Sequence, residues 1–468
     1  METSFNIIVI GSGPGGYIAA IRSAQLGYKV AIVEKYSLLG GTCTNVGCIP
    51  SKALLDATEN YHAAKSKFSL QGIEIKELQL NFQKLMERKN EVVKQNTSGL
   101  NYLMKKNKIT VIEGTASFTS NTEISVTKKD GGKQQFKSTY FIIATGSKPA
   151  TIKGVEIDKK RIITSTEALT LTEKPTSIAI IGGGVIGVEM ASIYARIGTK
   201  VTIIEYADTL IPTMDRELGK ELRKIITRTG VVVLTGQKVQ SAVNTGNNVI
   251  ITYQDAANAK QELAVDYCLV AVGRKPYTEG LGLENTGVQK DEKGRIKTNN
   301  YLQTADSNIY AIGDVIEGPM LAHKAEEEGS FVSEIINGQK PHLDYERIPA
   351  VIYTWPEVAS VGYTEEQLKE KGIDYKKGKF PFSASGRARA ANDTDGFTKV
   401  LTGVKYGEIL GVHIIGARAA DLIAQAVIAI TYEATDEDLF RLSYAHPTYS
   451  ESLKEAYLIS SGQGALNI

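Results

Sequence analysis

The sequence predicts an α/β protein with two Rossmann-like dinucleotide-binding domains and a C-terminal α+β domain. The first observation behind this prediction is a pattern of strand, glycine turn, helix, strand and acidic residue at the start of the chain, and the second is its repetition from residue 177 onward. The third is length, because 468 residues are too many for one hydrophobic core and should divide into about three domains. We therefore expect the chain to bind two nucleotide cofactors.

The first unit opens with a short apolar, β-branched run at residues 6–10, which is typical of a buried parallel strand. A G-x-G-x-x-G motif follows, and a second strand after the helix ends at Glu34. Gly11 allows the tight turn, Gly13 lets the backbone approach a pyrophosphate, and Gly16 lets the helix pack close to the strand. Glu34 can accept hydrogen bonds from a ribose. A lone motif of this kind is often only a turn, but this order of elements predicts dinucleotide binding.

The second unit repeats the first. A strand at residues 177–181 precedes Gly182, Gly184 and Gly187, and a further strand at residues 200–204 is followed by Glu205. A carboxylate at this position favours the free 2′-hydroxyl of NAD and repels the phosphate of NADP, and no arginine cluster follows it. The second unit is therefore predicted to bind NAD.

Between the two units lies a pair of cysteines. Cys43 and Cys48 would be about 8–9 Å apart (Cα to Cα) in one continuous helix, and a disulfide rarely spans more than about 7 Å. Gly47 offers a place for the backbone to bend. Pro50 fits the first turn of a helix, which puts Cys48 near a helix N-terminus, where a thiolate is stabilised. Lys52 adds a cation on the same helix face.

The cysteine pair has two other possible roles. A zinc site would need two further cysteine or histidine ligands, usually nearby, and the third cysteine, Cys268, lies far along the chain in an apolar run. A chance pair of buried thiols is the second alternative. In a reducing compartment a close pair is more often catalytic than a structural staple, and its neighbours favour a redox disulfide. No metal site is predicted.

The segment from Gly40 to Lys52 resembles the active-site sequence of the pyridine nucleotide–disulfide oxidoreductases, and the resemblance extends over essentially the whole chain. Further matching motifs are the A-T-G turn before Ser147, the G-R-x-P turn at Gly273 and the H-P-T-x-S-E motif that starts at His446. The resemblance implies FAD and NAD as cofactors and a homodimer. It divides the chain into an FAD-binding domain (1–150), an NAD-binding domain (151–275), a central segment that completes the FAD site (276–343) and a dimerisation domain (344–468).

The same resemblance implies the cofactor-binding residues. The FAD site would comprise Gly11, Gly13, Gly16, Glu34, Lys35, Gly41, Thr42, Lys52, Gly114, Thr145, Gly146, Ser147, Asp314, Met320, Leu321, Ala322 and His323. The NAD site would comprise Gly182, Gly184, Gly187, Glu189, Glu205, Val239 and Gly273.

The resemblance also implies a catalytic set, which is Cys43, Cys48, His446, Glu451, Lys52 and Glu189. Cys43 would be attacked by a substrate thiolate, and Cys48 would leave and pass electrons to the flavin. His446 would be the acid–base that Glu451 orients, and both would act in the active site of the partner subunit. Lys52 and Glu189 would form an ion pair beside the flavin.

The implied reaction is the oxidation of protein-bound dihydrolipoamide with reduction of NAD. The implied partners are the lipoyl domains of 2-oxo acid dehydrogenase complexes and the lipoyl protein of glycine cleavage. A glutathione-type reductase should carry basic residues after Glu205, and a mercuric reductase should carry extra C-terminal cysteines; neither feature is present. A non-catalytic flavin- or lipoyl-binding scaffold is the remaining alternative, and the intact set of Cys43, Cys48 and His446 disfavours it.

Net charge and the distribution of apolar residues exclude some classes of binding partner and indicate a compartment. The net charge of +2 creates no field that would attract nucleic acid or an acidic membrane surface. No apolar run reaches membrane-spanning length. The first strand begins close to the initiator methionine, so we expect a cytoplasmic protein, or a processed organellar form that begins in the same way.

Overall fold

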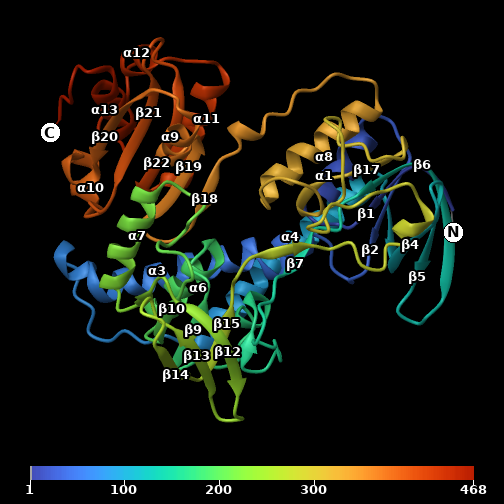
Figure 1. Cartoon of the computed structure of the whole chain (residues 1–468), viewed down its shortest axis with the longest axis horizontal. Coiled ribbons are helices and arrows are strands. Elements are labelled where there is room, and N and C mark those ends of the chain that lie inside the picture. Colours follow the sequence, from blue (N-terminus) through green and yellow to red (C-terminus); the bar gives the residue numbers. More distant parts are fainter. Residues whose placement is uncertain (1–2, 468) are drawn as a thin grey trace. The chain divides into compact units, whose positions relative to one another are not determined.

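The structure, a computed structural model, describes residues 3–467 and contains two compact units. Unit 1 consists of the residues up to Ala53 together with 86–150 and 273–345, and unit 2 consists of 54–85, 151–272 and 346–468. Figure 1 shows the elements of both units, coloured along the sequence.

Unit 1 is built on one mixed sheet with the strand order β3-β2-β1-β6-β5-β4, and β17 pairs with β6. Every position of β2 is buried, as expected for a parallel strand covered on both faces. The first half of β6 pairs antiparallel with β5, and its second half pairs parallel with β1 and β17. The strands are β1 (Ser4–Ile10), β2 (Val30–Glu34), β3 (Thr110–Glu113), β4 (Thr115–Ser120), β5 (Glu123–Thr127), β6 (Lys133–Ile143) and β17 (Ile309–Ala311).

Helices α1 and α8 pack against each other beside this sheet (Figure 1). The close approach depends on Gly15, where a Cβ atom would lie 2.9 Å from the carbonyl oxygen of Ala325. The helices are α1 (Pro14–Gln25), α2 (Gly41–Val46), α3 (Cys48–Ser66), which starts in this unit, α4 (Phe82–Lys106) and α8 (Ala322–Ile336). A small antiparallel pair, β7 (Ser147–Pro149) with β16 (Arg274–Pro276), joins two segments that are far apart in the sequence.

Unit 2 contains a parallel sheet with the order β11-β10-β9-β15-β8 and an antiparallel sheet with the order β12-β13-β14. The central strands β9 and β10 begin and end where the sequence predicts. The strands are β8 (Ile162–Ile163), β9 (Ser177–Ile181), β10 (Lys200–Ile204), β11 (Val232–Leu234), β12 (Lys238–Asn244), β13 (Val249–Gln254), β14 (Lys260–Val265) and β15 (Tyr267–Val270). The accompanying helices are α5 (Ser165–Ala168), α6 (Val185–Arg196) and α7 (Arg216–Arg228).

The C-terminal part of unit 2 is an antiparallel sheet with the order β18-β19-β22-β21-β20. Its core includes apolar residues of α11 and α13, and α13 packs so closely that a Cβ at Gly378 would lie 1.8 Å from the carbonyl oxygen of Ala456. The strands are β18 (Ala350–Ile352), β19 (Glu357–Gly362), β20 (Tyr375–Pro381), β21 (Phe397–Gly403) and β22 (Ile409–Gly416). The helices are α9 (Glu365–Lys371), α10 (Gly386–Ala391), α11 (Ala419–Thr431), α12 (Asp436–Phe440) and α13 (Glu451–Ser461).

The predicted fold class is confirmed in both nucleotide units and in the C-terminal α+β part. The division into four segments at 150, 275 and 343 stays a prediction. Among the residues that the structure describes, no helix has the length and apolar character needed to cross a membrane.

Candidate active site

In the first glycine turn, two glycines have no room for a side chain and the third faces open space. Gly11 has a φ of +102°, and a Cβ there would lie 2.4 Å from the carbonyl oxygen of Ala144. A Cβ at Gly16 would lie 1.9 Å from the carbonyl oxygen of Gly11. By contrast, no atom lies within 4 Å of the Cβ position of Gly13, the residue before the N-terminus of α1. This open backbone at a helix N-terminus fits the pyrophosphate of a dinucleotide.

The second glycine turn has the same construction. Gly182 has a φ of +110°, and its Cβ position lies 2.4 Å from the carbonyl oxygen of Ala271. The Cβ position of Gly187 lies 1.9 Å from the carbonyl oxygen of Gly182, whereas that of Gly184 has no atom within 4 Å. The first turn follows β1, which lies between β2 and β6, and the second follows β9, which lies between β10 and β15. In each sheet the chain order reverses at this strand. That point is where open α/β sheets bind ligands.

The two predicted ribose-binding acids, Glu34 and Glu205, each accept hydrogen bonds from the glycine turn of the same nucleotide-binding motif. The Glu34 carboxylate is buried and accepts hydrogen bonds from the backbone nitrogen (3.0 Å) and the hydroxyl (2.6 Å) of Ser12. Glu205 accepts from the backbone nitrogens of Gly183 and Ala207, the latter at 2.6 Å. A carboxylate oxygen can accept more than one hydrogen bond, so both acids can also receive ribose hydroxyls. The two units therefore offer matching cradles for two nucleotides.

The cysteine pair lies where the chain bends. Cys43 is within α2, Gly47 leaves helical geometry with φ of −139° and ψ of −110°, and Cys48 begins α3. Both cysteines are free thiols and half-buried. The hydrogen bond to Cys48 and burial raise the pKa of the Cys43 thiol, and the positive charge of Lys52 acts in the opposite direction. In the reduced dithiol these surroundings favour the protonated form of Cys43.

Several predicted FAD residues gather in unit 1 around the dithiol and the first glycine turn. A Cβ at Gly41 would lie 2.7 Å from the Cα atom of Gly13. The Thr145 hydroxyl donates to the carbonyl oxygen of Tyr277 at 2.7 Å, and the Lys35 ammonium lies 3.9 Å from the centroid of the Tyr277 ring.

The other predicted FAD residues of unit 1 lie at strand ends and at the start of α8. The backbone nitrogen of Gly114 donates to the carbonyl oxygen of Glu34 at 2.9 Å. Gly146 has a φ of +70° and open space at its Cβ position, while Thr42 is exposed near the start of α2. Met320 and Leu321 lead into α8, whose first two residues are Ala322 and His323.

Ser147, Asp314 and Arg274 form a connected polar group in unit 1. The hydroxyl of Ser147 donates to the carboxylate of Asp314, and Arg274 donates from Nε to that hydroxyl and from Nη2 to the carbonyl oxygen of Ser147, both at 2.7 Å. Burial lowers the pKa of Arg274, and the negative charges of Asp314 and Cys48 raise it. Arg274 was not among the predicted site residues, because its contacts with Ser147 depend on the pairing of β7 with β16, which are far apart in the sequence.

His446 and Glu451 form a close pair in unit 2. Nδ1 of His446 lies 2.8 Å from Oε1 of Glu451, the first residue of α13. The second carboxylate oxygen accepts from the backbone nitrogen of Thr448 at 2.8 Å, which holds the carboxylate in place. The His446 side chain is 77% exposed. The contact with Glu451 therefore engages Nδ1 of the ring.

The remaining predicted residues of unit 2 are Glu189 and Val239. The Glu189 carboxylate is buried in α6 and accepts from the backbone nitrogen of Tyr353 at 3.0 Å. Val239 lies in β12 at a register shift opposite β13. The predicted ion pair between Lys52 and Glu189 stays a prediction, because the two residues belong to different units.

Comparison with known proteins identifies the family. Residues 5–329 match the pyridine nucleotide-disulphide oxidoreductase model, and residues 348–457 match the dimerisation domain of these enzymes. The chain belongs to the pyridine nucleotide-disulphide oxidoreductase family. This confirms the predicted family, the enzyme class and the use of FAD and NAD.

Individual members of the family resemble the chain over nearly its full length. It is 45% identical to the mitochondrial dihydrolipoyl dehydrogenase of Pisum sativum, with 96% of this chain and 90% of that protein covered. It is 46% identical to the leghemoglobin reductase of Vigna unguiculata, with 96% and 86% covered. The solved structure of the HOCl-induced flavoprotein disulfide reductase RclA from Escherichia coli, a Cu(II) complex, matches with a TM-score of 0.88 at 29% identity, with 98% and 100% covered.

This oxidoreductase also has a tyrosine–glutamate pair that acts electrostatically on the dithiol and was not predicted from the sequence. The Tyr17 hydroxyl on α1 donates to Oε1 of Glu326 on α8 at 2.9 Å. Burial and the negative charge of Glu326 raise the pKa of Tyr17. The charge of Glu326 also raises the pKa of Cys43. Nothing in the local sequence marks this pair, because it arises from the packing of two distant helices.

A buried ion pair supports the turn that carries Asp314. The Lys324 ammonium and the Glu328 carboxylate are 2.9 Å apart and have no exposed side-chain surface. Glu328 accepts from the backbone nitrogen of Gly313 (2.7 Å) and from the Tyr345 hydroxyl (2.6 Å), while Lys324 donates to the carbonyl oxygen of Gly313 (3.1 Å). In the sequence, this pair is indicated only by the spacing of four residues between Lys324 and Glu328, which puts them on one helix face.

Lys324→Met is expected to destabilise this turn. It leaves Glu328 buried without its cation, which costs about 3–5 kcal/mol of unfolding free energy. The purified variant should show a lower urea midpoint and a lower FAD-to-protein absorbance ratio. Adding Glu328→Gln should recover part of both losses, because it removes the uncompensated charge and keeps an acceptor. The exposed Lys340→Met is the control. Unchanged FAD content in Lys324→Met would contradict a supporting role of the pair.

Proposed function

We propose that this oxidoreductase is a dihydrolipoyl dehydrogenase, which oxidises protein-bound dihydrolipoamide to lipoamide and reduces NAD⁺ to NADH. The observation that carries the proposal is the pair of free thiols, Cys43 in α2 and Cys48 at the start of α3, in a chain 45% identical to a protein of that name. The matching nucleotide cradles and the pair of His446 and Glu451 support it.

The chemistry begins with a proton transfer. Nε2 of His446 takes a proton from one thiol of dihydrolipoamide, and Glu451 at Nδ1 stabilises the imidazolium that forms. The substrate thiolate attacks Sγ of Cys43 in the oxidised enzyme, an S–S bond forms, and the bond between Cys43 and Cys48 breaks. Cys48 leaves as a thiolate, which the N-terminus of α3 favours.

The second substrate thiol then closes the lipoamide ring. Its sulfur attacks the substrate sulfur that is bonded to Cys43, the bond to Cys43 breaks, and lipoamide is released. The proton of this second thiol passes to the departing Cys43 sulfur, while His446 keeps the proton of the first thiol. The raised pKa of Cys43 favours this final protonated form. Bound FAD supplies the two-electron transfer between the dithiol and NAD, while the protein orients the cofactor and sets its electrostatic surroundings.

The choice of NAD follows from Glu205. Its carboxylate is tied to the backbone nitrogens of Gly183 and Ala207, which places negative charge at the end of β10. A 2′-phosphate there would meet this charge. Glu205→Ala combined with Tyr206→Arg is expected to raise the ratio of kcat/KM for NADP to that for NAD by about tenfold or more, because a charge-assisted hydrogen bond contributes about 1.5–3 kcal/mol. Steady-state kinetics with both cofactors measures the ratio.

The control for this prediction is Tyr206→Arg alone, which changes an exposed residue and keeps the carboxylate. It should shift the ratio far less than the double variant. Equal use of NAD and NADP by the unmodified enzyme would show that Glu205 does not select the cofactor.

We further propose a homodimer in which His446 completes the active site of the partner subunit. The family's dimerisation domain is present at residues 348–457. The proposal is supported by the exposure of His446 and by two large exposed side chains on or next to α11, Ile428 (60%) and Tyr432 (81%). Other residues of α11, among them Leu422, Ile423 and Ala426, pack in the core of the C-terminal part.

The partners and the compartment stay predictions. They are the lipoyl domains of 2-oxo acid dehydrogenase complexes, the lipoyl protein of glycine cleavage, and the cytoplasm. The deciding assay for the activity compares NADH formation from dihydrolipoamide with NADPH-dependent reduction of glutathione disulfide by the purified protein. We expect turnover only in the first reaction. Turnover only in the second would overturn the proposal in favour of a glutathione-type reductase.

A further inference from the structure

One buried carboxylate in unit 2 serves the N-termini of two helices. Asp215 is the N-cap of α7, and its Oδ1 atom accepts from the backbone nitrogen of Glu217 at 3.0 Å. Its Oδ2 atom accepts from the backbone nitrogen of Glu365, the first residue of α9, at 3.2 Å. Asp215 has no exposed surface. One side chain therefore links the helix after the second nucleotide strand, β10, to a helix of the C-terminal part.

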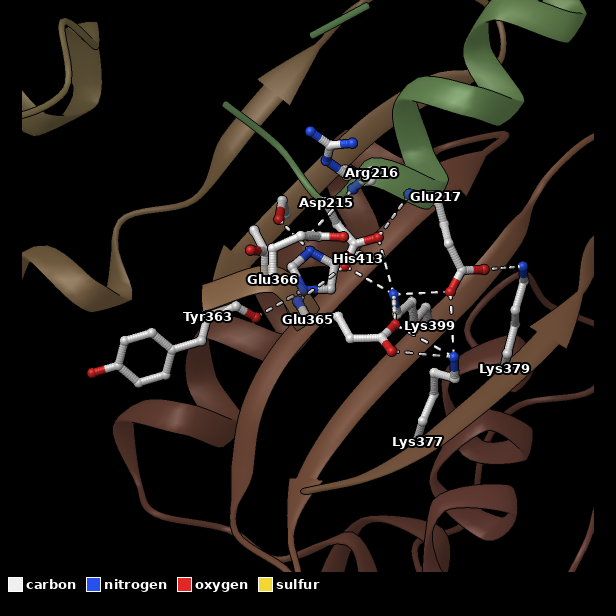
Figure 2. A network of polar contacts seen from close by, with 12 residues as sticks. Asp215, Arg216, Glu217, Tyr363, Glu365, Glu366, Lys377, Lys379, Lys399 and His413 are labelled. Atoms are coloured by element: carbon white, nitrogen blue, oxygen red, sulfur yellow. Dashed lines mark hydrogen bonds and ion pairs between the residues drawn. The ribbon is translucent and has the colours of Figure 1, made fainter. Parts of the chain in front are cut away.

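A buried lysine compensates the charge of this carboxylate. Nζ of Lys399 on β21 lies 3.0 and 2.9 Å from the two oxygens of Asp215, 2.6 Å from Glu365 and 3.0 Å from Glu217. Figure 2 shows these three carboxylates around Lys399. An ammonium has three donors, and three carboxylates surround it here. His413 lies beside this cluster, and burial lowers its pKa, so that it adds no charge. Removing one member of such a buried cluster leaves its partners uncompensated.

The chain segment that precedes Asp215 connects it to the predicted NAD site. The segment between Glu205 and Asp215 contains Leu210 and Ile211, which are 0% and 1% exposed. The backbone nitrogen of Ile211 donates to the carbonyl oxygen of Gly183 at 2.9 Å, and the backbone nitrogen of Gly183 donates to the carboxylate of Glu205. A Cβ at Gly183 would lie 2.6 Å from Cδ2 of Leu210. The segment therefore packs directly on the glycine turn and on the acid that selects NAD.

This segment is held in a strained conformation. Ile211 has a φ of +46°, in the left-handed region that a β-branched residue rarely adopts. Such a conformation persists only where the surroundings enforce it. Glu205 and its turn hold one end of the segment, and the buried cluster holds Asp215 at the other end. If the hold on Asp215 weakens, the strain at Ile211 can relax, and the turn at Gly183 moves with it.

We propose that Lys399 and Asp215 are positioning residues for NAD, which keep the segment 205–215 in the shape that presents Glu205 and Gly183 to the adenosine ribose. The cluster makes the nucleotide cradle depend on the sheet of the C-terminal part. The inference rests on the proposed NAD site at Gly182–Glu205 and adds residues that never touch the nucleotide.

The test uses Asp215→Asn in the FAD-loaded, full-length enzyme, with dissociation constants for NAD⁺ and for ADP-ribose measured by fluorescence titration. We expect both dissociation constants to rise about 3- to 30-fold, the range of coupling carried by residues outside a binding site. They should rise by the same factor, because ADP-ribose contains the adenosine ribose and lacks nicotinamide. The KM for dihydrolipoamide should stay within about twofold, which separates the effect from general damage to the enzyme.

Lys379→Met is the matched control. Lys379 lies on the neighbouring strand β20 and also pairs with Glu217, but its side chain is 41% exposed (Figure 2). Its removal should leave both nucleotide affinities unchanged. Lys399→Arg, which keeps the positive charge, should lose less nucleotide affinity than Lys399→Met.

Several outcomes would overturn the inference. One is a lower melting temperature of Asp215→Asn with unchanged affinity for NAD⁺ and ADP-ribose, which would make the cluster purely structural. Another is a parallel rise in the KM for dihydrolipoamide. Should Asp215→Asn fail to fold, Glu217→Gln at the rim of the cluster takes its place and is expected to lose less affinity for NAD⁺ and ADP-ribose. Unchanged affinity in Glu217→Gln would then overturn the inference. Direct NAD⁺ binding needs no lipoamide turnover, so a failed dihydrolipoamide assay would reject the proposed function and leave this test intact.

Discussion

Cys48→Ser is expected to retain yellow, bound FAD and to lose turnover of dihydrolipoamide by at least about 10⁴-fold, as is typical when an essential reacting side chain is removed. Cys48 begins α3, and without its sulfur no disulfide can form with Cys43. Neither the glycine turn at Gly13 nor the polar group around Asp314 contains this side chain, so FAD binding should persist. The measurements are NADH formation from dihydrolipoamide and the visible absorbance of the purified variant.

Two controls separate loss of the thiol from general damage. Reduction of a quinone by NADH needs only the flavin and should survive in Cys48→Ser. Cys268→Ala removes the third thiol, which lies in β15 and whose pKa burial raises to about 12, and it should keep full activity with dihydrolipoamide. Retained turnover in Cys48→Ser would reject the dithiol mechanism.

His446→Ala is expected to lower turnover about 10²- to 10⁴-fold, the usual contribution of a positioned general base. The exposed imidazole and its contact with Glu451 suit a base that acts on a thiol outside its own subunit. This gives a sharper test than the single variant. Mixing inactive Cys43→Ser with inactive His446→Ala under subunit exchange should restore activity, because one of the two sites in each heterodimer receives an intact cysteine pair and an intact histidine.

The recovered activity should approach half that of wild type per heterodimer. If the histidine served the cysteines of its own subunit, every site would carry one lesion and mixing would restore nothing. Subunit exchange must be verified independently, for instance with differently tagged subunits in a pull-down. With exchange verified, absence of recovery would show that the active site is not shared. Glu451→Gln in place of His446→Ala should be a milder lesion, since it orients the ring but stabilises the imidazolium less.

Features that depend on neighbouring residues in the chain could be predicted from the sequence. The glycine turns at Gly11 and Gly182 are local, because a tight turn needs positive φ and an adjacent helix needs room to pack. The bend at Gly47 and the start of a helix at Cys48 follow from a glycine and a proline within a few residues. The pair of His446 and Glu451 spans a single turn before α13, and its motif was visible for the same reason.

Only the tertiary structure decided which distant groups share a buried charge or a hydrogen bond. Arg274 meets Ser147 because β16 pairs with β7, and Tyr17 meets Glu326 because α1 packs on α8. Lys399 appears in the sequence as an ordinary polar residue in a strand, yet folding buries it among three carboxylates. The physical reason is that a charge can be buried only where opposite charges converge on it, and that convergence depends on the packing of elements that are remote in the chain.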